Sequence, residues 1–112
     1  MILHCDEDVG AGIPHALKDV GLDVRAHHKV GWSGQPDTVW LPRAGQLEWL
    51  VYSHNKKMLT VPLEKLAIVN GNVGIIFLTS GEENTVNQLR LLLNRWDTLE
   101  LLWKTTPTPM DK

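Results

Sequence analysis

The sequence predicts an α/β domain, a three-layer α/β/α sandwich in which helices cover both faces of a central, mostly parallel sheet. Short apolar runs typical of strands alternate along the chain with segments whose apolar residues recur at helical spacing. Strands separated by helices imply right-handed crossovers, which place helices on both faces of a parallel sheet. The length of 112 residues suits one domain, predicted at residues 1–104, followed by a tail at residues 105–112.

The first part of the chain supplies two predicted strands with a helix between them. Residues 2–5 are a short apolar run typical of a buried strand, which we expect at the centre of the sheet. Residues 13–20 carry apolar side chains at helical spacing, and Gly21 follows where helices commonly end in a left-handed residue. Residues 22–27 alternate between apolar and polar side chains, which predicts a second, more exposed strand.

The middle of the chain continues this alternation. Residues 37–46 predict a short helix whose later part Pro42 would distort. Residues 49–52 predict a third strand, and residues 63–69 predict a further short helix. Residues 73–78 form a continuous apolar run, which suits the middle of a parallel sheet.

The last part of the chain predicts one long helix and a tail. Ser80 and Glu83 have capping-box spacing ahead of this helix. Its predicted apolar stripe consists of Val86, Leu89, Leu93 and Trp96. The tail has two prolines and no apolar period, so it is either a frayed end or a short edge element.

Composition excludes several classes of protein. A hydrophobic content of 43% with 21% charged residues is ordinary for a globular protein, and the net charge of −2 gives no overall attraction to nucleic acid or membrane. The single cysteine, Cys5, excludes an intramolecular disulfide and a cysteine-based zinc site. Because neither a membrane-spanning run nor a signal peptide is visible, we expect a cytoplasmic protein without membrane contact.

Three consecutive acids, Asp6, Glu7 and Asp8, follow the first predicted strand. The carboxyl ends of parallel strands open onto the crevice where such sheets bind ligands. Neighbouring carboxylates repel one another, and a cation or bulk water must offset their charge. The triplet therefore predicts either a metal site or a plain helix start, and Asp8 is the residue best suited to cap the first helix.

Other polar side chains should gather at the same edge of the sheet. Ser53, His54 and Asn55 follow the third strand, and Asp37 begins a helix that could lean over the crevice. His54 is a weak candidate for an acid or base. The predicted crevice is therefore polar and mostly acidic.

Histidines and tryptophans give weaker signals. Adjacent side chains on a strand face apart, so His27 and His28 do not predict a shared zinc ion. Trp32 lies in a glycine-flanked loop, where it could stack on a base, although capping the sheet edge or meeting a partner is favoured. The remaining tryptophans are predicted as core or dimer contacts: Trp40, Trp49, Trp96 and Trp103.

Residues 5–8, 37–41 and 49–56, in this order and spacing, resemble the PIN-like ribonucleases. The similarity is closest to the compact branch that forms the toxin half of VapC-type toxin–antitoxin pairs. It continues through residues 61–64 and 77–81, so it spans nearly the whole chain. The resemblance implies an α/β/α sandwich with an acidic cluster that binds Mg²⁺ or Mn²⁺ and hydrolyses RNA phosphodiester bonds.

The resemblance carries over to particular residues. Asp6 matches the family's first-strand aspartate, Asp37 matches the acid that begins the middle helix, and Asn55 stands where the family has a third acid. These three are the expected catalytic and metal-binding residues, with Glu7 as a further metal ligand. The candidate RNA contacts are Lys56, Lys57 and Arg43.

The predicted function is a metal-dependent endoribonuclease, the toxin component of a type II toxin–antitoxin pair, with RNA, a cognate antitoxin and a second copy of the chain as partners. The alternative is a catalytically impaired PIN-like protein that binds RNA or the antitoxin, and Asn55 is its main support. A phosphoacceptor module fails because no aspartate ends the third strand.

Overall fold

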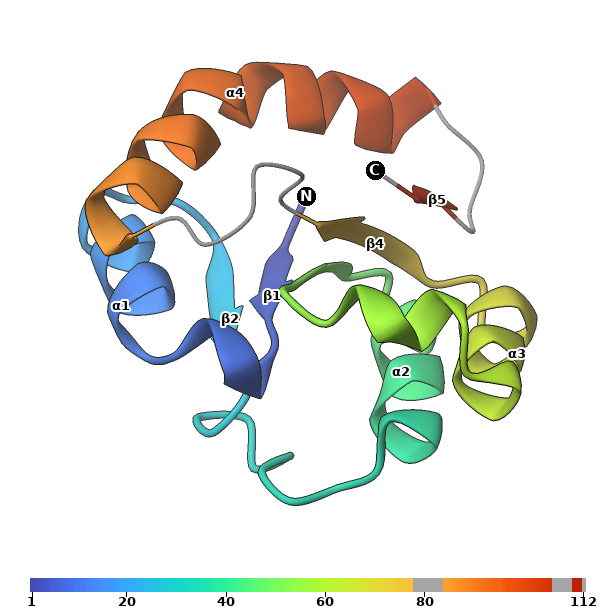
Figure 1. Ribbon diagram of the computed structural model, residues 1–112. Coiled ribbons are helices and arrows are strands. Elements are labelled where there is room, and N and C mark those ends of the chain that lie inside the picture. Colours follow the sequence, from blue (N-terminus) through green and yellow to red (C-terminus); the bar gives the residue numbers. More distant parts are fainter. Residues whose placement is uncertain (78–83, 106–109, 112) are drawn as a thin grey trace.

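The computed structural model describes residues 1–77, 84–105 and 110–111 and contains one parallel sheet (Figure 1). The strands lie in the order β2-β1-β3-β4-β5, and each neighbouring pair is parallel. They are β1 (Leu3–Cys5), β2 (Val24–Ala26), β3 (Leu50–Ser53), β4 (Gly74–Phe77) and β5 (Met110–Asp111). The predicted α/β fold with helices around a parallel sheet is confirmed, although β3 rather than β1 is the middle strand.

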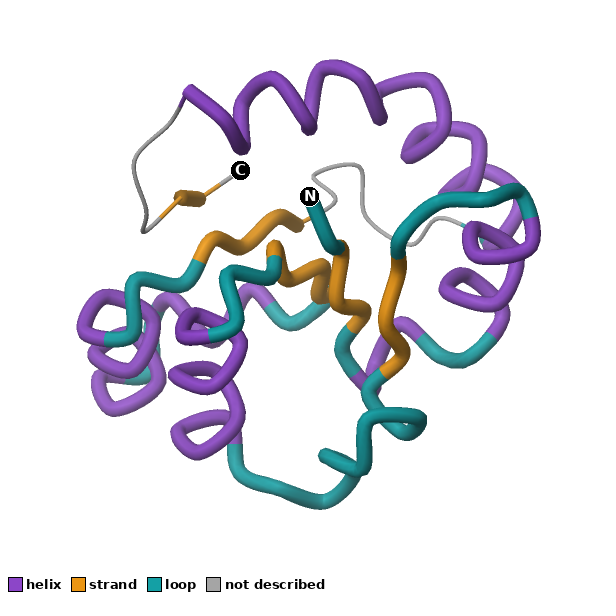
Figure 2. Tube along the Cα trace, turned by 180° about the vertical axis from the view of Figure 1, so that it is seen from behind, coloured by secondary structure: helices purple, strands orange, loops and turns teal. Residues whose placement is uncertain are grey.

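Within the described residues, four α-helices cover the two faces of the sheet (Figures 1 and 2). They are α1 (Gly12–Asp19), α2 (Asp37–Gln46), α3 (Pro62–Asn70) and α4 (Thr85–Thr105). Two short 3₁₀ helices, η1 (Glu7–Val9) and η2 (Lys56–Leu59), follow β1 and β3. None of the helices in the described residues is long and apolar enough to cross a membrane.

Two apolar cores result from the alternation of side chains along the strands. Leu50 and Tyr52 of β3 pack in the core beneath α1 and α4. Val51, between them, packs in the other core, beneath α2 and α3, together with Trp40. Each face of the sheet therefore carries its own apolar core, between the strands and the helices that cover that face.

The register of the sheet brings three loops together at one edge. Cys5 of β1 pairs with Tyr52 of β3 on one side and with Ala26 of β2 on the other. The next residue of β1, Asp6, donates its backbone N–H to the Tyr52 carbonyl at 2.9 Å. Consequently Asp6 and His27, which follow β1 and β2, and Ser53, the last residue of β3, are near neighbours.

The start of the first helix differs from the prediction. Asp8 does not cap α1, because it lies within η1, and the residue at the cap of α1 is Ala11, whose side chain makes no capping bond. Asp6 caps η1 instead, accepting a hydrogen bond from the Glu7 backbone N–H. The predicted left-handed residue after the helix is confirmed, since Gly21 has a φ of 92°.

Trp32 is a core residue, not an exposed base-stacking platform. It is 6% exposed and its ring centroid lies 4.8 Å from that of His4. Gly31 and Gly34 both have a φ of 80°, and these left-handed turns return the loop to the sheet. Trp40 and Trp96 are buried, as predicted for core contacts.

The buried face of α4 also differs from the prediction. Its buried residues are Gln88, Leu92 and Trp96, whereas Val86 and Leu93 are 61% and 47% exposed. The capping box predicted at Ser80 and Glu83 lies outside the described residues. The predicted limits of domain and tail stay a prediction, although residues 110–111 pair with β4.

Helices α2 and α3 approach each other so closely that only glycine fits at Gly45. A Cβ atom at Gly45 would lie 1.9 Å from the Gly71 carbonyl oxygen and 3.3 Å from Val73 Cγ2. We expect Gly45→Ala to lower the free energy of unfolding by about 3 kcal/mol, measured by urea denaturation. The control is Gly12→Ala, where the nearest atom is 3.9 Å away and little change is expected. Equal stabilities of the two variants would contradict the close packing.

Candidate active site

Asp6 is the buried centre of the candidate site. Its side chain lies just beyond β1 and the residue is 7% exposed. The Ser53 hydroxyl donates to Asp6 Oδ2 at 2.9 Å, and the Glu7 backbone N–H donates to Asp6 Oδ1 at 2.6 Å. A carboxyl group held by two donors and largely removed from water has a fixed orientation.

Burial and neighbouring carboxylates both raise the pKa of Asp6. Burial is the main cause that raises the pKa of the Asp6 carboxyl from 3.8 to about 6. The carboxylate of Asp8 adds to this increase, and that of Asp37 contributes more weakly. Because like charges disfavour the ionised form, the three carboxylates form one negative region. The structure thus places Asp6 and Asp37, predicted from separate segments, within electrostatic reach of each other.

Ser53 connects the two loops that follow β1 and β3. It is fully buried, and besides donating to Asp6 its oxygen accepts the Asn55 backbone N–H at 3.1 Å. Asp8 Oδ2 is 3.4 Å from the same hydroxyl, and Asp8 Oδ1 accepts the His54 backbone N–H at 3.2 Å. Ser53 was predicted at this edge of the sheet but was given no role there, and its position on the strand beside Asp6 was the signal that could have supplied one.

Asp37 is held at the first turn of α2. It is half-buried, and its Oδ1 accepts a hydrogen bond from Trp40 Nε1 at 2.9 Å. Its charge also acts on Glu64 of α3, whose pKa is raised by burial and by Asp37. Glu64 Oε2 is buried and has no hydrogen-bond partner in the part of the chain that the structure describes. Glu64 is therefore a further carboxylate within electrostatic reach of Asp37, and the prediction omitted it.

His4 and His27 form a buried pair behind Asp6. His4 Nε2 and His27 Nδ1 are 3.0 Å apart, and His27 Nδ1 is 4.0 Å from Asp6 Oδ1. Burial, with His27 as the second cause, lowers the pKa of His4 to about 3, and burial also lowers the pKa of His27. Both rings are consequently neutral near pH 7. The sequence prediction compared His27 only with His28, which is exposed, and missed this pair across the strands.

A family model for the PIN-like domain matches residues 1–80, which contain Asp6, Asp37 and Asn55. The chain belongs to the PIN-like domain family. The comparisons with curated proteins and with solved structures found no match. Membership in this family points to the nuclease superfamily.

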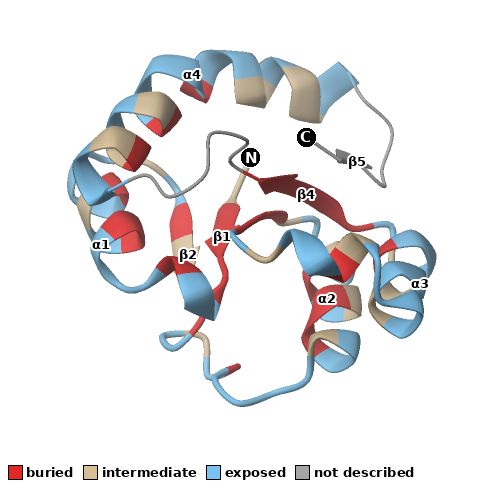
Figure 3. Ribbon diagram, in the orientation of Figure 1, coloured by how far each residue is buried: buried red, intermediate tan, exposed pale blue. Residues whose placement is uncertain are grey.

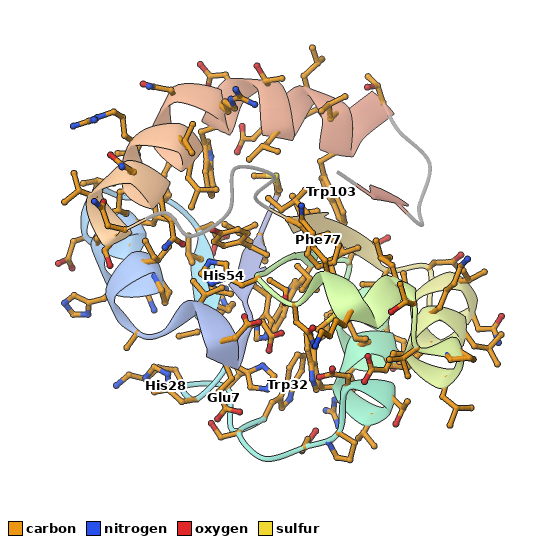
Figure 4. All side chains as sticks on the ribbon, in the orientation of Figure 1. Glu7, His28, Trp32, His54, Phe77 and Trp103 are labelled. Carbon is orange, nitrogen blue, oxygen red and sulfur yellow. The ribbon has the colours of Figure 1, made fainter. Side chains whose placement is uncertain are left out.

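The remaining predicted residues of the PIN-like domain lie on three different elements. Asn55 is half-buried at the start of η2, and Glu7 is exposed in η1, on the loop after β1 (Figure 4). The candidate RNA contacts are all exposed: Lys56 and Lys57 lie in η2, and Arg43 lies in the last turn of α2.

The imidazole of His54 contacts Tyr52 and Gln88, while the His54 backbone N–H donates to Asp8. Its Nε2 lies 2.8 Å from Gln88 Oε1 of α4 and 3.1 Å from the Tyr52 hydroxyl, which itself donates to Gln88 Oε1 at 2.8 Å. The imidazole therefore faces α4, on the side of the sheet opposite α2 and α3. This arrangement favours a structural role for His54 over the acid–base role that was a weak candidate.

The metal-binding capacity of the site rests on oxygen donors. Among residues 1–77, 84–105 and 110–111, no group of three or more His, Cys, Asp or Glu side chains is arranged to hold a metal ion. Mg²⁺ commonly uses one or two carboxylates and keeps several water ligands, so a preformed cage is not required. The carboxylates of Asp6 and Asp37 meet that minimum, and the unpartnered Glu64 oxygen is a further hard donor.

Proposed function

We propose that this PIN-like domain is a metal-dependent endoribonuclease that uses Mg²⁺ or Mn²⁺ to hydrolyse RNA phosphodiester bonds. The observation that carries the proposal is the buried carboxyl of Asp6, which the Ser53 hydroxyl and the Glu7 backbone N–H hold in place. It lies at the carboxyl end of an interior strand, where the charges of Asp8 and Asp37 act on it and help to raise its pKa. Such a region repels phosphate until cations offset its charge, which is the situation expected of a metal-dependent nuclease site.

The proposed metal ligands differ in charge. Asp6 and Asp37 supply anionic oxygens, Asn55 supplies a neutral amide oxygen, and Glu7 is a further ligand on the adjoining turn. A bound divalent ion would lower the pKa of a coordinated water and offset charge on the phosphate oxygens. Ser53 orients Asp6 and the backbone of Asn55 through its two hydrogen bonds, so it acts as a positioning residue.

The lysines beside the site suit an RNA backbone. Lys56 and Lys57 follow Asn55 directly and are exposed, and Arg43 is exposed on α2. Cationic side chains of this kind make contacts to phosphates that position a nucleic acid without reading its sequence. We propose that they hold single-stranded RNA across the acidic crevice.

We further propose that the enzyme is the toxin half of a type II toxin–antitoxin pair in the cytoplasm. The support is the resemblance of residues 5–8, 37–41 and 49–56 to the VapC-type branch. The partner would be a cognate antitoxin that covers the crevice.

Asn55 favours a second candidate function. An amide in place of a third carboxylate weakens the hold on a second metal ion, since two ions close together need more negative charge than one. The second candidate is therefore a PIN-like protein that binds RNA or an antitoxin with little or no cleavage.

Cleavage of a labelled single-stranded RNA, with Mn²⁺ or with a chelator, tests the proposal. We expect cleavage by the wild-type protein only with the metal, and a loss of at least about tenfold in Asp37→Asn because a charged ligand is removed. A melting scan gives a readout apart from activity: metal at a hundredfold excess over Kd should stabilise the wild-type protein by about 2.7 kcal/mol.

The matched control is Asp19→Asn, because Asp19 is exposed on α1, away from the crevice. It should leave both cleavage and metal-induced stabilisation unchanged. Metal-independent cleavage, or equal loss in the two variants, would overturn the enzyme proposal. RNA binding without cleavage would favour the second candidate.

A further inference from the structure

The outer face of α4 carries a stripe of five exposed residues, here called the outer stripe: Val86, Arg90, Leu93, Asp97 and Leu101. Its three apolar members, Val86, Leu93 and Leu101, are 61%, 47% and 62% exposed. Successive members are three or four residues apart, so they lie on one side of the helix. Figure 3 shows exposed residues along the outer side of α4, opposite its buried positions.

The outer stripe has the same pattern in both directions. Reading forward from Val86, Arg90 comes four positions later and Leu93, near the middle of the stripe, comes three positions after Arg90. Reading backward from Leu101, Asp97 comes four positions earlier and Leu93 comes four positions before Asp97. The two charged positions are equivalent in spacing and opposite in sign. A helix with this pattern is complementary to its own reversed copy.

We propose that the outer stripe is a homodimer interface in which α4 packs antiparallel against α4 of a second copy of this chain. A two-fold axis between Leu93 and Asn94 places Arg90 opposite the second copy's Asp97, and symmetry repeats this pair. The same axis places Val86 opposite the second copy's Leu101. A two-fold axis requires one surface to match itself, and this stripe meets that requirement in both charge and apolar contacts.

The charges on the outer stripe favour a second copy over an unrelated partner. Arg90 and Asp97 are seven residues apart, about 10 Å along the helix axis, which is too far for an ion pair within α4. The contact of Arg90 Nη1 with Asn87 Oδ1 is long, at 3.5 Å. In the dimer each charge pairs with an opposite charge of the second copy, and the three apolar residues are buried away from water.

The interface does not depend on the proposed nuclease function. The outer stripe lies on the α4 side of the sheet, whereas Asp37 and Glu64 lie on α2 and α3 on the other side. Residues 86–101 span about 22 Å of helix, so the contact is small and we expect a concentration-dependent dimer.

Sedimentation equilibrium of the full chain at rising concentration tests the interface. R90D puts Asp against the second copy's Asp97, and D97R puts Arg against its Arg90, so each variant should weaken dimerisation by at least about tenfold. The R90D/D97R double variant restores opposite charges and should dimerise like the wild type. A mixture of the R90D and D97R chains should form heterodimers.

Leu93→Asp should also abolish the dimer, and the control is Leu63→Asp, at an exposed leucine of α3. Circular dichroism verifies that each variant keeps its helices. A wild-type chain that stays monomeric over the whole concentration range overturns the proposal. A dimer that tolerates R90D and Leu93→Asp, or charge reversals without rescue, overturns it as well.

Discussion

Replacing Asn55 with aspartate is expected to raise both metal affinity and RNA cleavage by at least about tenfold. The Asn55 backbone N–H donates to the Ser53 hydroxyl, which itself donates to Asp6, so the substitution adds a carboxylate on the segment next to the acids. It would restore the charge that the amide lacks. The measurements are calorimetric titration with Mn²⁺ and cleavage of labelled RNA.

The same substitution should lower stability without metal. A further carboxylate beside Asp6 and Asp8 adds to a repulsion that already raises the pKa of Asp6. Asn55→Asp should therefore melt at a lower temperature in chelator and gain more from added Mn²⁺ than the wild type does. This combination distinguishes a gained ligand from a change in fold.

Asn70→Asp is the matched control, because Asn70 is exposed at the end of α3. It introduces the same charge away from the acids and should change neither metal affinity nor cleavage. Unchanged metal binding in Asn55→Asp would show that Asn55 does not face the metal position.

Most helices and strands could be predicted because their signals are local. The pair Pro36-Asp37 predicts the start of a helix over residues 37–46, and α2 spans Asp37–Gln46. The buried face of α4 was predicted wrongly, because apolar residues lie on several sides of this helix. Three consecutive leucines, Leu91–Leu93, give α4 apolar residues on different sides, so the period alone could not identify its buried face.

The contacts around Asp6 could be predicted only in part, because they depend on strand register. The position of Asp6 at the end of a strand was predicted from local sequence. Ser53 and His27 reach Asp6 through the pairing of β1 with β3 and β2, which no single segment specifies. Glu64 enters through the packing of α3, and the close approach at Gly45 that permits this packing has no local signal.

Asp6→Asn is expected to have two opposite effects: loss of cleavage by at least about a hundredfold and a gain in stability near pH 7. The first follows from removing the charged ligand at the centre of the site. The second follows because burial and Asp8 raise the pKa of Asp6 from 3.8 to about 6, so ionising Asp6 costs free energy in the folded state.

The sign of the pH dependence follows from proton binding. Between pH 3.8 and about 6 the folded protein holds the Asp6 proton more tightly than the unfolded chain does. The free energy of unfolding therefore falls as pH rises through this interval, by about 3 kcal/mol at most. Above the interval the whole cost is present, and below it the cost vanishes.

Urea denaturation of wild type and Asp6→Asn in chelator, over a series of pH values, measures this cost. The variant should be more stable than the wild type above pH 6, and the difference should shrink as pH falls toward 3.8. Asp19→Asn removes only an exposed contact with His15 and should show no gain in stability above pH 6. An Asp6→Asn protein that is less stable at every pH would mean that the hydrogen bonds from Ser53 and Glu7 outweigh the repulsion and burial. A variant that is more stable in chelator but no longer stabilised by Mn²⁺ would show two things about Asp6. Its carboxylate destabilises the metal-free protein, and it is needed to bind the cation.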